Sequence, residues 1–464
     1  MVPELPVSHP DAPPGPPPGP PPGPPGSFLR QFRPALADPL RFLEDMARYG
    51  GVVTLRRNRT YLVTDPDAIG RIFQDNHFNF VKGERYIRAL EPLFGRGLLT
   101  SEGDLWKRQR RLIQPVFHRA NHDGYAKVIV AETQARLAAW HEVARAGAAL
   151  DIREEMTALT LAILMRTVFG QTTREDVDEV GQAFLAAHHE MNITAAFLPV
   201  RIPAWVPTPG RRRFARALAV IDGFINRMVD ARQGATAGGT DFLSRLLDAR
   251  DPETGAAMPR QQVRDEVITM LAAGHDTVTE ALTWTFYLVA QHPDVEARAH
   301  DEIVAVLVGR PPIAADVKAM PWVTQIVEES MRLYPPIWGI LRTTIAEDVL
   351  GGHPIPAGAR VITSPWVVHR SPALWPEPAA FRPERFGPEQ EAGRHRFAYF
   401  PFGAGPRQCV GSQFSMLEVP LIAAMVWREF SVRLAPGQDI RPLPRVSLRA
   451  DRPVWAHLSR RGDA

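Results

Sequence analysis

Apolar residues recur every three or four positions over most of this chain, which is the spacing of an amphipathic helix. The longest such stretch, residues 261–291, is apolar on several faces, so it predicts a buried helix of roughly 45 Å at 1.5 Å per residue. The other predicted elements are helices over residues 104–114, 125–250 and 410–430, and strands over 52–63, 361–363 and the tail beyond 434. The expected fold class is mainly α with a smaller β region.

The first 26 residues consist mostly of proline and glycine. Gly15, Gly19 and Gly23 repeat with a period of four, whereas collagen requires glycine at every third position. We therefore expect residues 1–26 to form a disordered or polyproline II leader without a catalytic role. Residues 27–464 are expected to form a single domain.

Charge and composition exclude several classes of protein. The 54 Lys and Arg residues nearly cancel the 51 Asp and Glu residues, so a nucleic-acid partner is not expected. No run of eighteen or more residues is wholly apolar, so no membrane anchor is expected. The single cysteine excludes an intramolecular disulfide and is typical of a reducing compartment, which predicts a cytoplasmic protein.

That cysteine, Cys409, lies in a glycine-rich loop just before the predicted helix 410–430. Glycines allow the backbone to fold tightly around one sulfur, and a helix N-terminus stabilises a thiolate, so the loop suits a metal ligand. The residues that carry a resemblance are Phe402, Gly405, Arg407, Cys409 and Gly411. Their spacing resembles the haem-binding signature of the cytochrome P-450 family.

The resemblance runs from about residue 28 to the C-terminus, and it implies the cytochrome P-450 fold of a haem-thiolate monooxygenase of the soluble bacterial type. Haem b would be buried between the long central helix and the cysteine loop. The sulfur of Cys409 would be the axial ligand of the iron, and Phe402, Arg407 and Gly411 would contact the cofactor. Dioxygen would be the co-substrate.

A glycine and two polar side chains interrupt the middle of the long helix, where burial makes them unfavourable for stability alone. Gly274, Asp276 and Thr277 resemble the oxygen-activation motif of the family. By that resemblance, Gly274 lets dioxygen approach, Thr277 donates a hydrogen bond to it, and Asp276 relays protons from solvent. His275 is given no role, and Val278 departs from the threonine or serine that many relatives carry.

Two pairs of side chains share the helix predicted over residues 104–114. Trp106 and Arg110 are four positions apart and therefore lie on one face. By resemblance they bind one haem propionate, and Arg342 reaches the second. Arg108 and Arg111 point elsewhere, and we hypothesise that they form a basic docking patch for an electron donor.

The resemblance also assigns a structural role to Glu329, Arg332 and Arg385, as a triad that locks the core beneath the haem. Alone, the Glu-x-x-Arg spacing is a weak signal, because surface helices contain many such pairs. The residues expected to line the substrate pocket are Phe94, Ala273, Ile337, Trp338 and Ile340.

These features predict an enzyme that hydroxylates or epoxidises a hydrophobic small molecule, such as a fatty acid, a terpenoid or a polyketide. Electrons would come from NAD(P)H through a separate ferredoxin or flavodoxin and its reductase. A peroxide-driven peroxygenase is the alternative enzyme, although such relatives generally replace the acid–alcohol pair. A haem-based sensor or ligand-binding protein would leave that pair unexplained.

Overall fold

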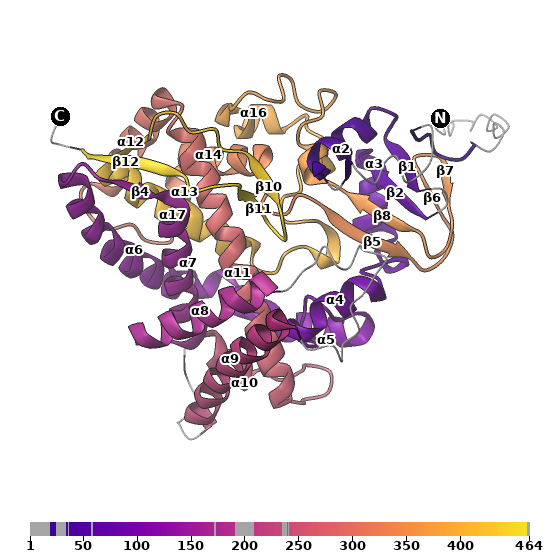
Figure 1. Cartoon of the computed structure of the whole chain (residues 1–464), viewed down its shortest axis with the longest axis horizontal. Coiled ribbons are helices and arrows are strands. Elements are labelled where there is room, and N and C mark those ends of the chain that lie inside the picture. Colours follow the sequence, from indigo (N-terminus) through magenta and orange to yellow (C-terminus); the bar gives the residue numbers. More distant parts are fainter. Residues whose placement is uncertain are drawn as a thin grey trace, which may run out of the picture.

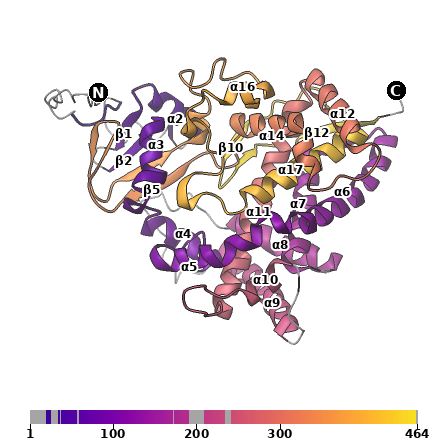
Figure 2. The same cartoon turned by 180° about the vertical axis from the view of Figure 1, so that it is seen from behind.

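The computed structural model describes residues 19–24, 34–35, 37–56, 59–170, 173–190, 208–233, 239 and 241–461. Helices form most of one side of the molecule, and a small mixed sheet with helices α2 and α3 forms the other (Figures 1 and 2). Helix α11 passes through the middle of the helical part in both views. This arrangement confirms a mainly α fold with a smaller β region.

The helices match the main predicted segments. The predicted central helix is α11, Arg260–Val289, and residues 104–114 fall mostly within α5, Gly103–Ile113. The others are α2 (Pro39–Ala47), α3 (Pro66–Gly70), α4 (Glu84–Phe94), α6 (His122–Arg145), α7 (Ile152–Phe169), α8 (Arg174–Glu190), α9 (Pro209–Gln233), α10 (Phe242–Asp248), α12 (Pro293–Leu307), α13 (Asp316–Ala319), α14 (Pro321–Leu333), α15 (Pro365–Val368), α16 (Pro388–Glu391) and α17 (Ser412–Glu429).

The strands form one five-stranded sheet and three smaller ones among the described residues. The larger sheet has the order β1-β2-β8-β5-β3, in which only the β2–β8 pair is parallel. The smaller sheets are β4-β12-β9, β10-β11 and β6-β7. The strands are β1 (Val52–Arg56), β2 (Thr60–Val63), β3 (Phe80–Val81), β4 (Ala149–Asp151), β5 (Ile340–Thr344), β6 (Asp348–Leu350), β7 (His353–Ile355), β8 (Arg360–Thr363), β9 (Phe430–Leu434), β10 (Pro442–Pro444), β11 (Leu448–Ala450) and β12 (Trp455–Arg460).

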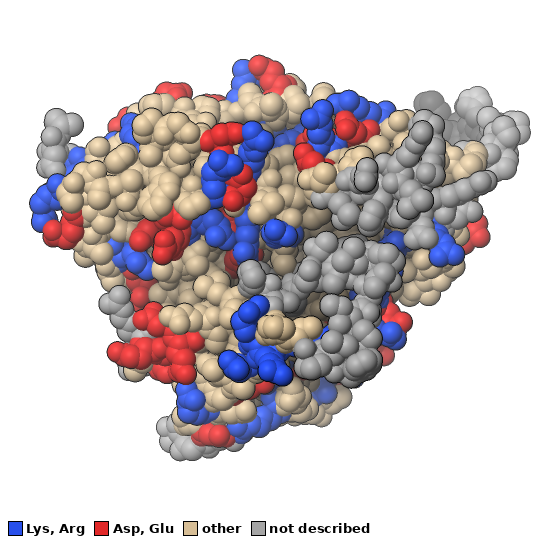
Figure 3. All heavy atoms as spheres, in the orientation of Figure 1, with Lys and Arg blue, Asp and Glu red and all other residues tan. Residues whose placement is uncertain are grey.

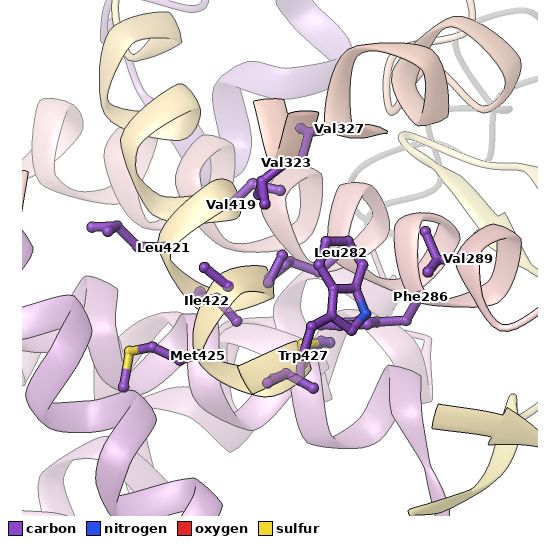
Figure 4. Packing of buried hydrophobic residues seen from close by; sticks show 14 of the residues in the cluster. Leu282, Phe286, Val289, Val323, Val327, Val419, Leu421, Ile422, Met425 and Trp427 are labelled. Carbon is purple, nitrogen blue, oxygen red and sulfur yellow. The ribbon is translucent and has the colours of Figure 1, made fainter. Parts of the chain in front are cut away.

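The largest core surrounds the C-terminal half of α11. Leu282, Phe286 and Val289 of this helix pack with residues of α14 and α17 (Figure 4). Apolar side chains of this size each contribute roughly 1.5–3 kcal/mol when fully buried. The packing fixes α11 against α17, whose N-terminus follows the cysteine loop, and so fixes the two walls of the site relative to each other.

Part of the proline-rich leader is docked on the mixed sheet. The backbone N–H of Thr54 donates to the carbonyl of Pro22 at 2.7 Å, and the Thr54 hydroxyl donates to the carbonyl of Pro21 at 3.1 Å. His353 contacts the carbonyl of Gly19 at 2.9 Å. Residues 19–24 are therefore held against the folded domain, and the rest of residues 1–26 lies outside the described part of the chain.

The surface shows no face of a single charge sign in the view of Figure 3, where basic and acidic side chains are interspersed over the described residues. This agrees with the near-cancellation of charge in the sequence. None of the helices in the described ranges carries a stretch long and apolar enough to span a membrane.

Candidate active site

A cavity of about 2030 Å³ lies between α11, the cysteine loop and the β5 side of the mixed sheet. Pockets for single drug-sized ligands measure roughly 300–1,000 Å³, so this one can hold a large cofactor together with a substrate. Every residue predicted from the sequence to act in catalysis, cofactor binding or substrate binding lines it. They are Phe94, Trp106, Arg110, Ala273, Gly274, Asp276, Thr277, Ile337, Trp338, Ile340, Arg342, Phe402, Arg407, Cys409 and Gly411.

The cysteine loop is shaped by glycine conformations that other residues rarely adopt. Gly405 has φ +67°, and a Cβ atom there would lie 1.7 Å from the carbonyl oxygen of Phe73. Any side chain at this position would therefore push the loop away from its neighbour. The backbone N–H of Cys409 donates to the carbonyl of Phe402 at 2.9 Å, which closes the loop just before α17 begins.

The sulfur of Cys409 faces the cavity, and protein surrounds it on the other sides. Burial raises the pKa of the thiol above its ordinary value. The backbone N–H groups of Gly411 and Ser412 and the nearby Arg110 act in the opposite direction, but they do not outweigh burial. The loop alone therefore does not hold a thiolate at neutral pH, and a cation bound at the sulfur would be needed to do so.

On the facing wall, α11 presents its unusual residues to the cavity. Ala273 is exposed in the middle of an otherwise buried helix because its side chain opens onto the cavity. Thr277 lines the same space, and its hydroxyl donates to the carbonyl of Ala273 at 2.7 Å. Gly274 also has a packing role, since a Cβ there would lie 3.1 Å from Cδ1 of Leu164 on α7.

Asp276 is held by two side chains from the C-terminal hairpin formed by β10 and β11. Its Oδ1 accepts a hydrogen bond from Arg449 at 2.6 Å, and its Oδ2 accepts one from the fully buried hydroxyl of Ser447. The hairpin is in turn fixed to α11, because the indole N–H of Trp284 donates to the carbonyl of Leu448 at 2.8 Å. Neither Ser447 nor Arg449 was predicted from the sequence.

Three cations gather at the side of the cavity formed by α5 and β5: Arg342, Arg407 and Lys82. Burial and repulsion by Arg407 lower the pKa of Arg342 to about 10, and the same two causes lower the pKa of Lys82 to about 7. Glu102 pairs with Arg407, and burial raises the pKa of the nearby Glu266 to about 8. The cluster therefore carries more positive than negative charge and favours an anionic ligand.

The other predicted propionate ligands lie against this cluster. The guanidinium of Arg407 lies 4.3 Å from the ring of Trp106, and one of its buried nitrogens, Nη1, has no hydrogen-bond partner among the described residues. Arg110 donates to the carbonyl of Gln408 at 2.8 Å, directly beside Cys409. The structure thus brings the α5 pair and the cysteine loop together, as the sequence predicted.

The two arginines expected to form a docking patch are engaged elsewhere. Arg108 pairs with Asp251 at 3.3 Å, and Arg111 pairs with Asp251 at 3.4 Å and with Glu253 at 2.9 Å. Their charges are therefore offset by a neighbouring acidic loop. This geometry does not support the docking role that we hypothesised for them.

The predicted triad forms a buried ion cluster outside the cavity. Glu329 accepts two hydrogen bonds from Arg332, at 2.6 and 2.8 Å, and both side chains are fully buried. Arg385 lies 3.3 Å from Glu329, and the backbone N–H of Arg382 donates to the same carboxylate at 2.8 Å. Arg332 also donates to the carbonyl of His369 at 2.8 Å. This cluster ties α14 to the segment that leads to the cysteine loop.

Comparison with known proteins gives a family match over most of the chain. The family model described as Cytochrome P450 matches residues 17–453. Cyclooctatin synthase of Streptomyces melanosporofaciens is 37% identical over 415 residues, which cover 89% of each chain. The cyclooctat-9-en-7-ol 5-monooxygenase of the same organism is 34% identical over 87% of each chain. Pentalenene oxygenase of Streptomyces avermitilis is 30% identical over 91% of this chain and 93% of its own.

The fold has a close counterpart among solved structures. The crystal structure of the cytochrome P450DA heme domain aligns with a TM-score of 0.86 over 95% of this chain and 97% of that chain. The two sequences are 26% identical over this alignment.

Proposed function

The chain belongs to the cytochrome P450 family of haem-dependent monooxygenases, and on that basis we propose that it hydroxylates or epoxidises a terpenoid at a haem iron ligated by Cys409. The observation that carries the proposal is the convergence of the cysteine loop, the α11 motif and the cation cluster on one cavity. When bound, the haem supplies activation of dioxygen, and a thiolate ligand favours cleavage of the O–O bond.

The residues of the cavity fit the two polar parts of haem b, which are its pair of propionates and its iron. The two propionates would meet Arg342, Arg407 and Lys82, whose charges the protein itself only partly offsets. The unpartnered Nη1 of Arg407 gains a hydrogen-bond acceptor in this arrangement. Iron would supply the cation that the buried Cys409 sulfur requires to remain a thiolate.

Thr277 and Asp276 are the residues proposed to manage protons. The hydroxyl of Thr277 is already fixed by its bond to the Ala273 carbonyl, so it is oriented without further loss of side-chain freedom. Asp276 precedes Thr277 on α11, lines the cavity and is bound to the C-terminal hairpin. A carboxylate in this position can take a proton from the solvent side and pass it inward.

The lining of the cavity supports a hydrophobic substrate. Around the α11 wall it is formed largely by apolar side chains: Phe94, Leu98, Leu99, Leu164, Val168, Met270, Ala273, Ile337 and Ile340. Such walls exclude water and bind by burying apolar surface. Among hydrophobic substrates we choose a terpenoid because two relatives are named for terpenoids. They are cyclooctatin synthase, which is 37% identical, and pentalenene oxygenase. Electrons would come from NAD(P)H through a ferredoxin or flavodoxin and its reductase.

The test is turnover of the purified holoenzyme with a panel of cyclic diterpene and sesquiterpene hydrocarbons. Binding is followed by the spin-state shift of the haem spectrum, and turnover is measured under ¹⁸O₂ with NAD(P)H, a ferredoxin and its reductase. We expect a terpenoid to shift the spectrum and to acquire one ¹⁸O atom. Turnover with hydrogen peroxide, but none with NAD(P)H, the ferredoxin and its reductase, would indicate a peroxygenase. A response only to fatty acids would contradict the substrate class.

A further inference from the structure

A second buried carboxylate lies one helical turn beyond Asp276 on α11. Glu280 is fully buried, and its Oε1 accepts a hydrogen bond from Arg153 of α7 at 2.9 Å. Its other oxygen, Oε2, is buried and has no hydrogen-bond partner in the described part of the chain. An incompletely satisfied carboxylate in the core is unfavourable for stability alone.

Arg449 is shared between the two carboxylates. Its Nη2 lies 2.6 Å from Oδ1 of Asp276, and its Nε lies 3.9 Å from Oε1 of Glu280. The contact with Asp276 is the tight one, and that with Glu280 is at the limit of an ion pair. Because the two carboxylates face different nitrogens of one guanidinium, the charge of Glu280 affects how strongly Arg449 binds Asp276.

Charged groups reach Glu280 from three elements. Asp276 lies on α11, Arg153 on α7 and Arg449 on β11. Asp151, directly before α7, accepts a hydrogen bond from the backbone N–H of Arg153. Burial is the largest cause that raises the pKa of Glu280, and repulsion by Asp276 adds to it. The two arginines oppose these effects, and the resulting pKa is about 7. Glu280 therefore changes its charge close to neutral pH.

We propose that Glu280, acting through Arg449, sets how firmly Asp276 is held away from Thr277, and that it is therefore a positioning residue for proton delivery. When Glu280 is protonated, Arg449 pairs with Asp276, which stays bound to the hairpin. When Glu280 loses its proton to solvent, it attracts Arg449 and repels Asp276. Asp276 can then take up a proton from solvent water, leave the arginine and turn toward Thr277. This inference rests on the proposed function.

The first test uses infrared spectroscopy and does not depend on turnover. A neutral buried carboxyl group gives a carbonyl band that disappears on ionisation. We expect the holoenzyme to lose several such bands between about pH 6 and pH 8, because burial also raises the pKa of Glu266 and of Glu418 to about 8. Glu280→Gln should lack one of the bands that titrate in the wild-type protein. If the two proteins have the same titrating bands, Glu280 does not ionise in this range, and the proposal fails.

The second test measures the pH dependence of oxygen reduction. The holoenzyme oxidises NAD(P)H with a ferredoxin and its reductase, without an organic substrate, between pH 6 and 8.5 in H₂O and D₂O. We expect the wild-type rate to rise severalfold through pH 7 and its solvent isotope effect to fall. Glu280→Gln should stay at the low rate and show no inflection. Ser447→Ala, which removes one of the groups that hold Asp276, should be faster than wild type at pH 6.

The control is Glu296→Gln. Like Glu280, Glu296 is buried and near two arginines, here Arg433 and Arg461, and it accepts a further hydrogen bond from Ser431. It does not line the cavity. This variant should keep the wild-type profile, and reduction of the haem, followed by trapping with carbon monoxide, should match wild type in every variant. A wild-type profile in Glu280→Gln would overturn this inference alone. Absence of oxygen reduction in the wild-type protein would overturn the proposed function instead.

Discussion

At the scale of single residues, the chemistry of the cavity depends on charges that the fold buries. Lys82 is only 8% exposed, and its ammonium donates to the carbonyls of Leu98 at 3.0 Å and Ser101 at 3.4 Å. These carbonyls satisfy hydrogen bonds but supply no negative charge. A propionate close to Lys82 would therefore stabilise its charged form and raise its pKa from about 7.

Replacement of Lys82 by methionine should weaken haem binding without changing the iron ligand. The lost ion pair is worth about 1.4 kcal/mol, which corresponds to a roughly tenfold faster loss of haem to an acceptor protein. Transfer of haem to apomyoglobin measures that rate. The control is Lys107→Met, since Lys107 is exposed and paired with Asp104. Equal rates for the two variants would contradict a propionate contact at Lys82.

Replacement of Thr277 by alanine should uncouple electron consumption from product formation. Without a positioned hydroxyl, product formation should fall by roughly a hundredfold, the low end of the roughly 10²–10⁴-fold effects of acid–base groups, and hydrogen peroxide should accumulate. Peroxide and product are measured per NAD(P)H consumed. Thr283→Ala removes the same type of helix hydrogen bond, from Thr283 to the Thr279 carbonyl at 2.7 Å, and neither of these residues lines the cavity. Similar coupling in both variants would remove Thr277 from the proton path.

The sequence could identify single residues only where the local pattern was unusual. Cys409 is the one cysteine and lies among glycines, and Thr277 lies in the middle of a buried helix. Lys82, Ser447 and Arg449 have no such signal, because their partners are more than a dozen residues away in the chain. A rare lysine in an arginine-rich chain was the one available hint for Lys82.

At the scale of elements, the buried ion cluster around Glu329 ties α14 to the segment that leads to the cysteine loop. Glu329 accepts hydrogen bonds from α14 itself and from the segment around residue 382. Removal of one partner of a buried pair is far more harmful than replacement of the whole pair, because an uncompensated charge remains. The Glu329 cluster is therefore expected to control stability and not the chemical step.

Glu329→Gln should destabilise the protein strongly. It leaves Arg332 without a charged partner in a fully buried position, which costs roughly 3–5 kcal/mol. The free energy of unfolding is measured by denaturant titration of the holoprotein. Glu384→Gln is the control, because Glu384 contacts Arg298 at 3.6 Å on an exposed surface, and exposed pairs contribute roughly 0–1 kcal/mol. A small effect at Glu329 would contradict the structural role of the triad.

Glu418 on α17 predicts a pH-dependent stability. Burial raises the pKa of its carboxyl to about 8, and no described residue forms a hydrogen bond with its Oε2. Because this pKa lies above the ordinary value, the neutral form stabilises the folded state at low pH. That stability is lost as the pH rises from the ordinary pKa through about 8.

Glu418→Gln should therefore resemble wild type near pH 4.5 and become more stable than wild type as the pH approaches 8. The difference is on the order of a few kcal/mol and should level off above pH 8. The thermal midpoint is measured for both proteins at several pH values. Glu389→Gln, at an exposed glutamate of α16, serves as the control. A difference that does not change with pH would show that Glu418 is not neutral in the folded protein.

The sequence pattern predicted the long helices closely, because burial imposes a regular apolar spacing. The predicted segment 261–291 corresponds to α11, Arg260–Val289. Pro420 lies inside α17, and the helix continues beyond it to Glu429. Strong packing of α17 on α11 and α14 can offset the hydrogen bond that proline removes. Such tertiary compensation has no local signature.

At the scale of the whole molecule, one helix organises both the core and the site. The C-terminal half of α11 is packed among α14 and α17 (Figure 4), and the middle of α11 forms a wall of the cavity. The hairpin of β10 and β11 reaches the same helix from the far end of the sequence. The site is therefore assembled from segments that no sequence window contains, and the family resemblance was needed to predict that they meet.

The central claim is that the Cys409 sulfur ligates a haem iron, and the most direct measurement is the absorption spectrum of the reduced holoprotein with carbon monoxide. We predict a strongly red-shifted Soret band, which a thiolate opposite the carbon monoxide produces. The variant Cys409→Ser, if it retains haem, should lack that band. A wild-type band at the position typical of histidine-ligated or thiol-ligated haem would contradict the claim and the oxidation chemistry that depends on it.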